Sequence, residues 1–399
     1  MDDMRNHRRF INVAHFIDHY VLLVFPTVAI GLEATLSRSY AELIVLSTAC
    51  FVAFGLFSLP WGWLADHWSR RKIMAIFFFG CAVSMAAAAA APNVYWLAGA
   101  LLLLGFFAAI YHPVGIPMLV SVARDRGRDF ATNGVWGNFG VAFAPGVTAA
   151  LMYWIGLRAA FIVPAVVCAI VGFAYLFLTQ EEKEKAGARA KIAEVPLTGG
   201  MMVAVFAFFA LLAFSGGTVF NILTIAIPKL IDERMAQEIP LVLLGSVATG
   251  VLLFGGAAQL TVGRLVSRFP PHVLLAWIGV MQVIGIVWAY LASGPMLLGA
   301  LALSIAAIYA QVTVGDVVIA RYTADAWRGR VFAVRFFLAF ITSGLAVWLI
   351  SSLLGKGGFD LVLMVTAVVA ALFAFATISI SILASKAESQ AAPAAQPAE

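Results

Sequence analysis

Apolar segments of about twenty residues follow one another along almost the whole chain. A helix needs about 20 such residues to cross the roughly 30 Å hydrocarbon core of a bilayer. The segments of this length are residues 10–34, 40–64, 73–91, 94–122, 129–154, 158–179, 200–228, 240–266, 273–291, 295–322, 329–354 and 359–384. Only 11% of the 399 residues are charged, less than half of the roughly 25% typical of soluble domains. The sequence therefore predicts an all-α integral membrane protein with twelve transmembrane helices.

Two short motifs occur twice, half a chain apart. The hexapeptide RGRDFA at residues 126–131 returns as RGRVFA at residues 328–333, and the turn GWLADHWSRRK at residues 62–72 has a shorter echo at residues 263–268. Repeats at half length in a membrane protein indicate a duplicated bundle. We expect two homologous six-helix bundles, residues 10–179 and 200–384, around a central cavity. The remaining segments are an N-terminus at 1–9, a charged linker at 180–199 and a disordered tail at 385–399.

The Lys and Arg residues are distributed very unequally between the two sides of the predicted bundle. Twenty of the 25 fall on the side of the N-terminus, which is the pattern of cytoplasmic loops. The other five are Arg38, Arg158, Lys229, Arg234 and Lys356. We therefore expect a multi-pass protein of a cell membrane, the bacterial inner membrane in particular, with both termini cytoplasmic. The net charge of +5 then follows from topology and does not indicate nucleic-acid binding.

The turn at residues 62–72, with its pattern G-x-L-A-D-x-x-S-R-R-K between the second and third apolar segments, resembles a signature of the major facilitator superfamily. The resemblance implies a secondary transporter whose cavity, lined chiefly by its first, fourth, seventh and tenth helices, opens to each side in turn. It also implies that Gly62, Asp66, Arg70 and Arg71 form a gate latch, which is made in the outward-facing state and broken in the inward-facing one. The alternative is an ordinary positively charged cytoplasmic turn.

Three further stretches resemble the fosmidomycin-resistance type of drug exporter within that superfamily. They are His15-x-x-Asp18, Tyr111-His112-Pro113 and Gly137-Asn138-Phe139-Gly140. The glycines and the proline of the fifth segment also resemble those of exchangers, which implies antiport. Small residues equally serve ordinary helix packing in membranes, so both interpretations of this segment stay open.

Ionisable side chains inside the apolar segments need a reason to be there, because each costs at least about 2.5–3.5 kcal/mol at the membrane centre. At 1.5 Å per residue, Asp18 lies about 12 Å from the cytoplasmic end of the first segment, and His112 lies about 15 Å from the cytoplasmic end of the fourth. His15 and His19 are one helical turn apart and near Asp18. A histidine titrates near neutral pH, so we predict proton coupling at Asp18, assisted by His15, His19 or His112. The alternative is a structural hydrogen bond that holds the first helix to its neighbours.

A second pair of opposite charges lies in the other half. Asp316 and Arg335 are both about 9 Å from the cytoplasmic end of their helices, which predicts a structural or gating ion pair. Arg335 could instead bind an anionic substrate. Its counterpart in the first half is Asn133, so this charge is specific to the second half. Polar or aromatic side chains expected at the cavity wall are those of Tyr111, Asn138, Asn221 and Gln311.

The function predicted from these features is secondary active transport, with proton-coupled export of a drug or organic anion as the main hypothesis. Proton-coupled uptake of an organic solute is the alternative. A remote third possibility is an intramembrane metalloenzyme with His15, Asp18 and His19 as ligands, but the usual glutamate base is missing and the duplication would be unexplained. We therefore predict a monomer that is not an enzyme and has no cofactor and no metal. Its partners are a small-molecule substrate, protons and the lipid bilayer.

Overall fold

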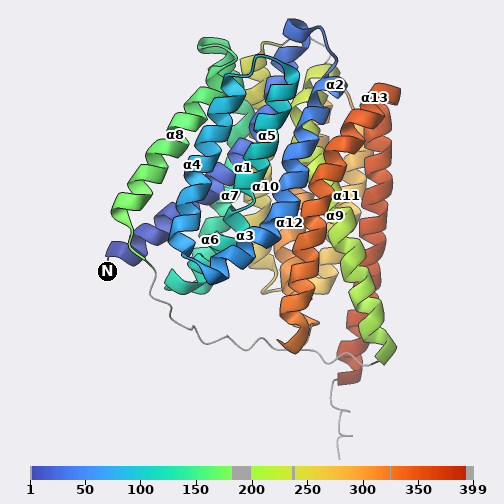
Figure 1. Cartoon of the computed structure of the whole chain (residues 1–399). Coiled ribbons are helices and arrows are strands. Elements are labelled where there is room, and N and C mark those ends of the chain that lie inside the picture. Colours follow the sequence, from blue (N-terminus) through green and yellow to red (C-terminus); the bar gives the residue numbers. More distant parts are fainter. Residues whose placement is uncertain (1, 182–198, 236–238, 324, 392–399) are drawn as a thin grey trace, which may run out of the picture.

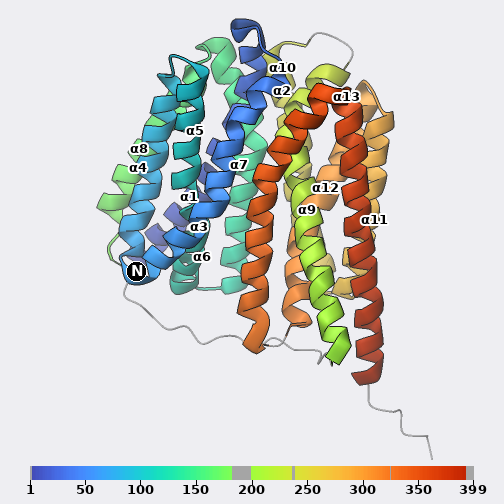
Figure 2. The same ribbon diagram turned by 45° about the vertical axis from the view of Figure 1, so that its right-hand side comes forward.

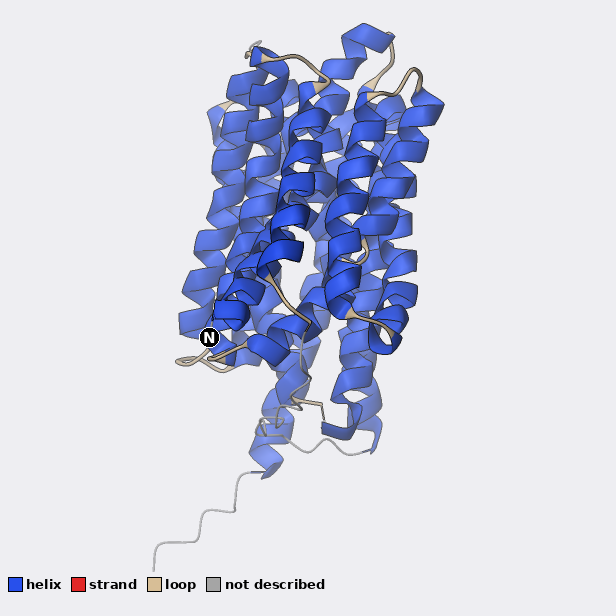
Figure 3. Ribbon diagram, turned by 60° about the vertical axis from the view of Figure 1, so that its left-hand side comes forward, coloured by secondary structure: helices blue, strands red, loops and turns tan. Residues whose placement is uncertain are grey.

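The computed structural model of the protein describes residues 2–181, 199–235, 239–323 and 325–391, and the regular elements of these residues are helices. Figure 1 shows them as one bundle of long, steeply inclined rods, and the loops drawn in tan in Figure 3 are short. The helices of the first half are α1 (Asp2–Leu36), α2 (Tyr40–Ile44), η1 (Val45–Ser47), α3 (Thr48–His67), α4 (Arg70–Ala89), α5 (Val94–Ala108), α6 (Tyr111–Val122), α7 (Arg126–Trp154) and α8 (Ala159–Leu178).

Local sequence explains where several of these helices begin and break. Ser69, Asn93 and Asp125 precede α4, α5 and α7, and the side chain of each accepts a hydrogen bond from a backbone N–H of the first turn, as good N-cap residues do. The fourth predicted segment is divided into α5 and α6 at Ala109. Pro113 has no N–H to donate to the carbonyl of Ala109, so the regular helical ladder is interrupted at that turn.

The helices of the second half are α9 (Gly199–Arg234), α10 (Leu241–Leu265), α11 (Pro271–Leu291), α12 (Pro295–Arg321) and α13 (Asp325–Ala391). The 67 residues of α13 would extend for about 100 Å if straight, some three bilayer cores. The backbone instead leaves helical geometry at Gly357 and at Gly358, where φ is 62°. Figure 2 shows α13 rising to this point and then returning. The break falls between the predicted segments 329–354 and 359–384.

Eleven helices within the described residues are long and apolar enough to span a membrane, and the last of them, Phe337–Gln390, includes this break. The all-helical membrane fold predicted from the sequence is therefore confirmed. The predicted count of twelve spans stays a prediction.

Both ends of the helical bundle extend further than the sequence predicted. α1 starts at Asp2, within the predicted N-terminal segment, and Asp3 accepts a hydrogen bond from the Gln180 N–H (2.9 Å). The predicted disordered tail is helical as far as Ala391, because Glu388 accepts hydrogen bonds from Arg321 (2.9 Å) and Tyr322 (2.7 Å). Burial and the Glu388 carboxylate raise the pKa of the Tyr322 phenol, which keeps it a donor. Residues 182–198 of the predicted linker and 392–399 of the tail lie outside the described residues.

The two halves pack their helices in the same way. In the first half α1 packs against α7, α3 against α5 and α4 against α8. In the second half the corresponding contacts are α9 with α13, α10 with α12 and α11 with α13. The packing therefore repeats in the order of the helices, as the sequence repeat predicts.

The two halves meet through α7 with α10 and through α3 with α13. The Gly146 N–H donates to Thr249 Oγ1 (3.1 Å) between α7 and α10, and Ser351 Oγ donates to the Ala41 carbonyl (2.8 Å) between α13 and the short α2. The short α2 lies at the end of the bundle away from the N-terminus and the C-terminal end of α13 (Figure 2). We call that end the distal end and the opposite end the proximal end.

Candidate functional site

A cavity of about 320 Å³ lies between the two halves. Its wall comes mostly from α1, α9 and α12, the first, seventh and tenth helices of the sequence prediction, whereas α6, from the fourth predicted helix, contributes only His112. The helices α3, α7, α10 and α13 supply the rest. The polar or ionisable side chains on the wall are His15, His19, His112, Asn138, Asn221, Thr224, Gln259, Tyr309, Gln311, Asp316, Arg335 and Ser343. Eight of the residues predicted from the sequence are in this set, and Asp18 and Tyr111 lie behind the wall.

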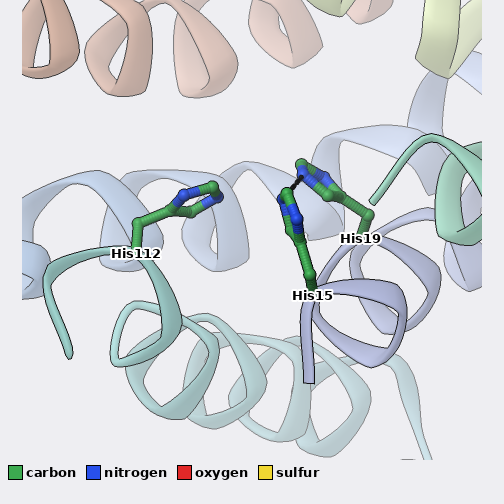
Figure 4. Close-up of side chains that lie close together, drawn as sticks. All are labelled: His15, His19 and His112. Carbon is green, nitrogen blue, oxygen red and sulfur yellow. Dashed lines mark hydrogen bonds between the residues drawn. The ribbon is translucent and has the colours of Figure 1, made fainter. Parts of the chain in front are cut away.

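Three histidines meet on the side of the cavity that belongs to the first half. His15 and His19 lie on successive turns of α1, and their Nε2 atoms are 3.2 Å apart. The ring of His112, on α6, is centred 5.5 Å from that of His15 and 5.6 Å from that of His19. One ring nitrogen of each residue lies within 4.8 Å of the others. Figure 4 shows the three rings projecting from the two helices toward one another.

Asp18 lies directly behind this histidine cluster. Its side chain is fully buried, and its Oδ2 atom is 3.4 Å from Nε2 of His112, whose side chain is 22% exposed. His112 lines the cavity, whereas Asp18 does not. The structure brings together the two ionisable residues that the sequence places at similar depth on different helices.

A layer of hydrogen bonds below the cluster fixes the orientation of His15. Nδ1 of His15 is 2.8 Å from the backbone carbonyl of Asn133 on α7, and the Tyr111 hydroxyl donates to Oδ1 of the same Asn133 (3.1 Å). The Tyr111 ring stacks on His15 with a centroid distance of 4.7 Å. Tyr111 was predicted at the cavity wall, but it is fully buried because it fills the space between His15 and Asn133. Sequence reasoning noticed Asn133 only as the counterpart of Arg335 and missed this supporting role.

Glycines of α7 allow the helix to pack tightly against α1 at the cluster. A Cβ atom at Gly137 would lie 2.6 Å from the His15 ring, and one at Gly140 would lie 2.3 Å from the Phe16 carbonyl oxygen. Neither position has room for a side chain. Gly146 instead contacts Thr249 of the other half. The glycine pattern thus serves helix packing, which is one of the two interpretations left open by the sequence, and the antiport interpretation stays a prediction.

The second half contributes amides and one ion pair to the wall. Gln311 of α12 donates to the Gly216 carbonyl of α9 (3.0 Å) and accepts from Gln282 of α11 (2.8 Å), so it joins three helices. Asp316 and Arg335 form an ion pair between α12 and α13, as the sequence predicted. Both residues line the cavity. The pair therefore links α12 to α13 at the wall of the cavity.

Two polar side chains predicted for the cavity have distinct partners. The Asn138 amide donates to Oε1 of Gln259, which links α7 of the first half to α10 of the second. Asn221 donates to the Gly217 carbonyl one turn back on its own helix (2.8 Å), and its side chain remains at the wall. Gln259 was not predicted from the sequence. No signal distinguishes it from other polar residues of the apolar segments.

The predicted gate loop connects α3 to α4 at the proximal end. Asp66 is 68% exposed and lies 3.4 Å from Arg70. The atom nearest to the Cβ position of Gly62 is Cβ of Pro113 on α6 (3.1 Å), so Gly62 serves packing within the first half. Arg71 donates to the carbonyls of Leu176 and Thr179 and so fastens α4 to the end of α8. The gate latch stays a prediction.

The comparisons with known proteins agree with this architecture. Residues 10–236, more than half of the chain, match the family model of the Major Facilitator Superfamily. A curated relative, the multi-drug resistance efflux pump PmrA homolog of Lactococcus lactis subsp. lactis (strain IL1403), is 31% identical over 135 residues. That match spans only a third of the length of each protein.

Solved structures show the same fold at low sequence identity. A bacterial homolog of the human lysosomal transporter Spinster, in an inward-facing and occupied conformation, is similar with a TM-score of 0.71 and 15% identity, covering 97% of this chain and 94% of the other. A mutant of the nucleoside transporter NupG is similar with a TM-score of 0.73 and 16% identity, covering 94% and 99%. The family match, the helical membrane fold and the cavity between two similar halves together show that this chain is a non-enzymatic transporter that belongs to the major facilitator superfamily.

Proposed function

We propose that the protein exports a small organic compound in exchange for protons, and that Asp18 and His112 form the site that takes up and releases the proton. The observation that carries the proposal is the 3.4 Å contact between the buried Asp18 carboxyl and the His112 imidazole at the cavity wall. A carboxyl in this place can stay neutral or share the proton of the imidazole, and the two groups can change protonation together. Each proton that moves down a potential of 100 mV provides about 2.3 kcal/mol for transport.

The character of the wall suggests the kind of compound. The apolar part of the cavity includes Leu22, Phe51, Phe54 and Phe220, and the Asp316–Arg335 pair lies on the same wall. A compound with an apolar body and one anionic group fits this arrangement, because Arg335 offers a planar set of donors for a carboxylate or phosphate. The curated relative that is an efflux pump supports export as the direction, over the third of the chain that matches it.

The test uses proteoliposomes that contain the full chain and an internal pH indicator, with a panel of amphipathic organic anions and dyes. A proton gradient in either direction should drive at least one compound against its own concentration gradient, while protons cross the membrane in the opposite direction to the compound. Asp18→Asn keeps the size of the side chain but cannot release a proton, so it should permit exchange of the compound without a gradient while abolishing uphill transport. Asp3→Asn removes a carboxyl from the same helix at the proximal end and serves as the matched control.

Two outcomes would contradict the proposal. If Asp18→Asn drives uphill transport as well as the wild type, Asp18 is not the coupling site and has only a structural role. If cells that contain the protein accumulate more of the transported compound when the proton gradient is intact, and less when it is collapsed, the direction is uptake.

A further inference from the structure

The histidine cluster contains more imidazole groups than the transfer of one proton requires. We propose that His15, His19 and His112 bind a divalent transition-metal ion of the zinc class at the cavity wall. This proposal does not depend on proton coupling or on the direction of transport. The sequence alone offered only His15 and His19 with Asp18 as ligands, whereas the fold adds the His112 imidazole from α6 (Figure 4). Asp18 lies behind that imidazole.

The hydrogen bond of His15 prepares its other ring nitrogen for a metal. A backbone carbonyl can only accept, so the 2.8 Å contact with the Asn133 oxygen places the ring proton on Nδ1 of His15. Nε2 of His15 then carries the lone pair, which accepts a hydrogen bond from Nε2–H of His19 (3.2 Å) and can bind a metal ion once the His19 proton has left. Histidine ligands of metals commonly donate their second ring N–H to a backbone carbonyl or carboxylate in this way, which fixes both tautomer and ring orientation. Tyr111, stacked on the ring, further restricts its rotation.

The spacing of the first two ligand atoms matches a tetrahedral site. Zinc binds histidine nitrogens at about 2.0–2.1 Å, so two such nitrogens at a tetrahedral angle are about 3.3–3.4 Å apart. The Nε2 atoms of His15 and His19 are 3.2 Å apart. The third nitrogen lies within 4.8 Å of both, so the third ring has to approach by no more than about 1.4 Å to complete the same geometry. His112 is 22% exposed and lies at the cavity wall.

The surroundings also lower the electrostatic cost of a dication inside the membrane. Asp18 is fully buried with its Oδ2 atom 3.4 Å from Nε2 of His112, so its ionised form places a negative charge close to the three histidines. Carboxylates in this second layer behind a histidine ligand raise its basicity and strengthen metal binding. All three histidines line the cavity, so an ion can reach them by the same route as the transported compound.

Three histidine ligands leave one coordination position of a tetrahedrally coordinated ion open to water or to another donor. Sites that hold a metal permanently use four protein ligands, whereas sites with three keep a position for an exchangeable ligand. In a transporter this position suits an anionic oxygen of the transported compound. The ligand class assigned to the cluster is therefore a zinc-class ion, free or already chelated by a small organic anion.

The test titrates the purified full chain, free of any polyhistidine tag, with Co²⁺ and then with Zn²⁺ as competitor. The wild type should bind one Co²⁺ per chain, with the visible absorption bands of a tetrahedral site, and Zn²⁺ should displace it. His19→Ala and His112→Ala should each weaken binding by at least about tenfold. His67→Ala removes an exposed histidine near the proximal end of α3 and should bind as the wild type does.

Thermal unfolding in the same detergent provides the second measurement. Zn²⁺ should raise the Tm of the wild type and of His67→Ala, because a ligand that binds only the folded state stabilises it. It should not raise the Tm of His19→Ala or His112→Ala, and the Tm values without metal show whether these variants fold. The proposal is overturned if the wild type binds no stoichiometric Co²⁺, or if folded His19→Ala binds it equally well. Such a failure would leave the Asp18→Asn transport test unaffected, so the two proposals fail separately.

Discussion

Replacing Glu33 should shift the protein toward the conformation in which the cavity opens at the distal end. Lys229, on α9 of the second half, lies 2.6 Å from Oε2 of Glu33 on α1 of the first half, and its side chain is only 10% exposed. It also lies 2.9 Å from Asp232 on its own helix. Alternating access requires the two halves to separate at the distal end when the cavity opens there. The Glu33–Lys229 contact has to break in that step, whereas the Asp232–Lys229 contact does not.

The size of the effect follows from the burial of this pair. Exposed ion pairs contribute about 0.2–1 kcal/mol, and removing one partner of a fully buried pair costs about 3–5 kcal/mol. Glu33 is 28% exposed and Lys229 keeps Asp232 as a partner, so the pair lies between these limits. We expect Glu33→Gln to remove about 1.5 kcal/mol from the state closed at the distal end. That corresponds to a change of roughly tenfold in the conformational equilibrium.

The measurement is a distance distribution between spin labels at Tyr95 and Met296, which are exposed near the distal ends of the first and second halves. Cys50, Cys81 and Cys168 are first replaced by alanine or serine. Glu33→Gln should increase the population with the longer distance about tenfold, and Asp232→Asn, which removes a carboxyl from the same lysine without separating the halves, should change it much less. Equal distributions in Glu33→Gln and the unmodified protein would refute the reasoning, as would an equal shift in Asp232→Asn.

Two further predictions concern packing and the second charged pair. A Cβ atom at Gly105 would lie 1.9 Å from the Cys50 carbonyl oxygen, and one at Gly99 on the same helix would contact nothing within 4 Å. Gly105→Ala should therefore lower the free energy of unfolding by about 1–3 kcal/mol or more, whereas Gly99→Ala should leave it unchanged or raise it; thermal unfolding in detergent distinguishes them. For the Asp316–Arg335 pair, Arg335→Gln should lower the Tm, and the exchange Asp316→Arg with Arg335→Asp should recover part of it. A doubly exchanged protein no more stable than Arg335→Gln would argue that the two charges have separate roles.

Much of the fold could be predicted from the sequence because lipid leaves few alternatives. The length of each apolar segment indicates where a helix crosses the membrane. The sequence repeat at half the chain length indicates that the two halves pack their helices alike. The errors arose at helix ends, where a few polar contacts decide the outcome. Glu388 extends α13 because Arg321 and Tyr322 lie within hydrogen-bonding distance, and that proximity is determined by tertiary packing. Hydropathy does not contain this information.

The candidate site was only partly predictable, for a related reason. Asp18 and His112 stand out because ionisable groups are expensive in lipid, and equal depth was enough to place them together. Depth along a helix does not determine which way a side chain points. Tyr111 and His112 are adjacent in sequence, yet Tyr111 is buried under His15 and His112 faces the cavity. Asn133 supports the cluster through its backbone carbonyl as much as its side chain, and residue type gives no indication of that role.

Some polar contacts lie within one half and others lie between the halves. This division determines whether an ion in the cavity stays bound while the cavity closes at one end and opens at the other. His15, His19, Asp18 and His112 all belong to the first half, so a rigid movement of that half preserves their distances. The Asp316–Arg335 pair belongs entirely to the second half and is preserved in the same way. The contacts between the halves, such as Glu33 with Lys229, must instead break and re-form. The geometry of the proposed metal site therefore stays the same when the halves move, and the access of the ion to either side depends on the contacts between the halves.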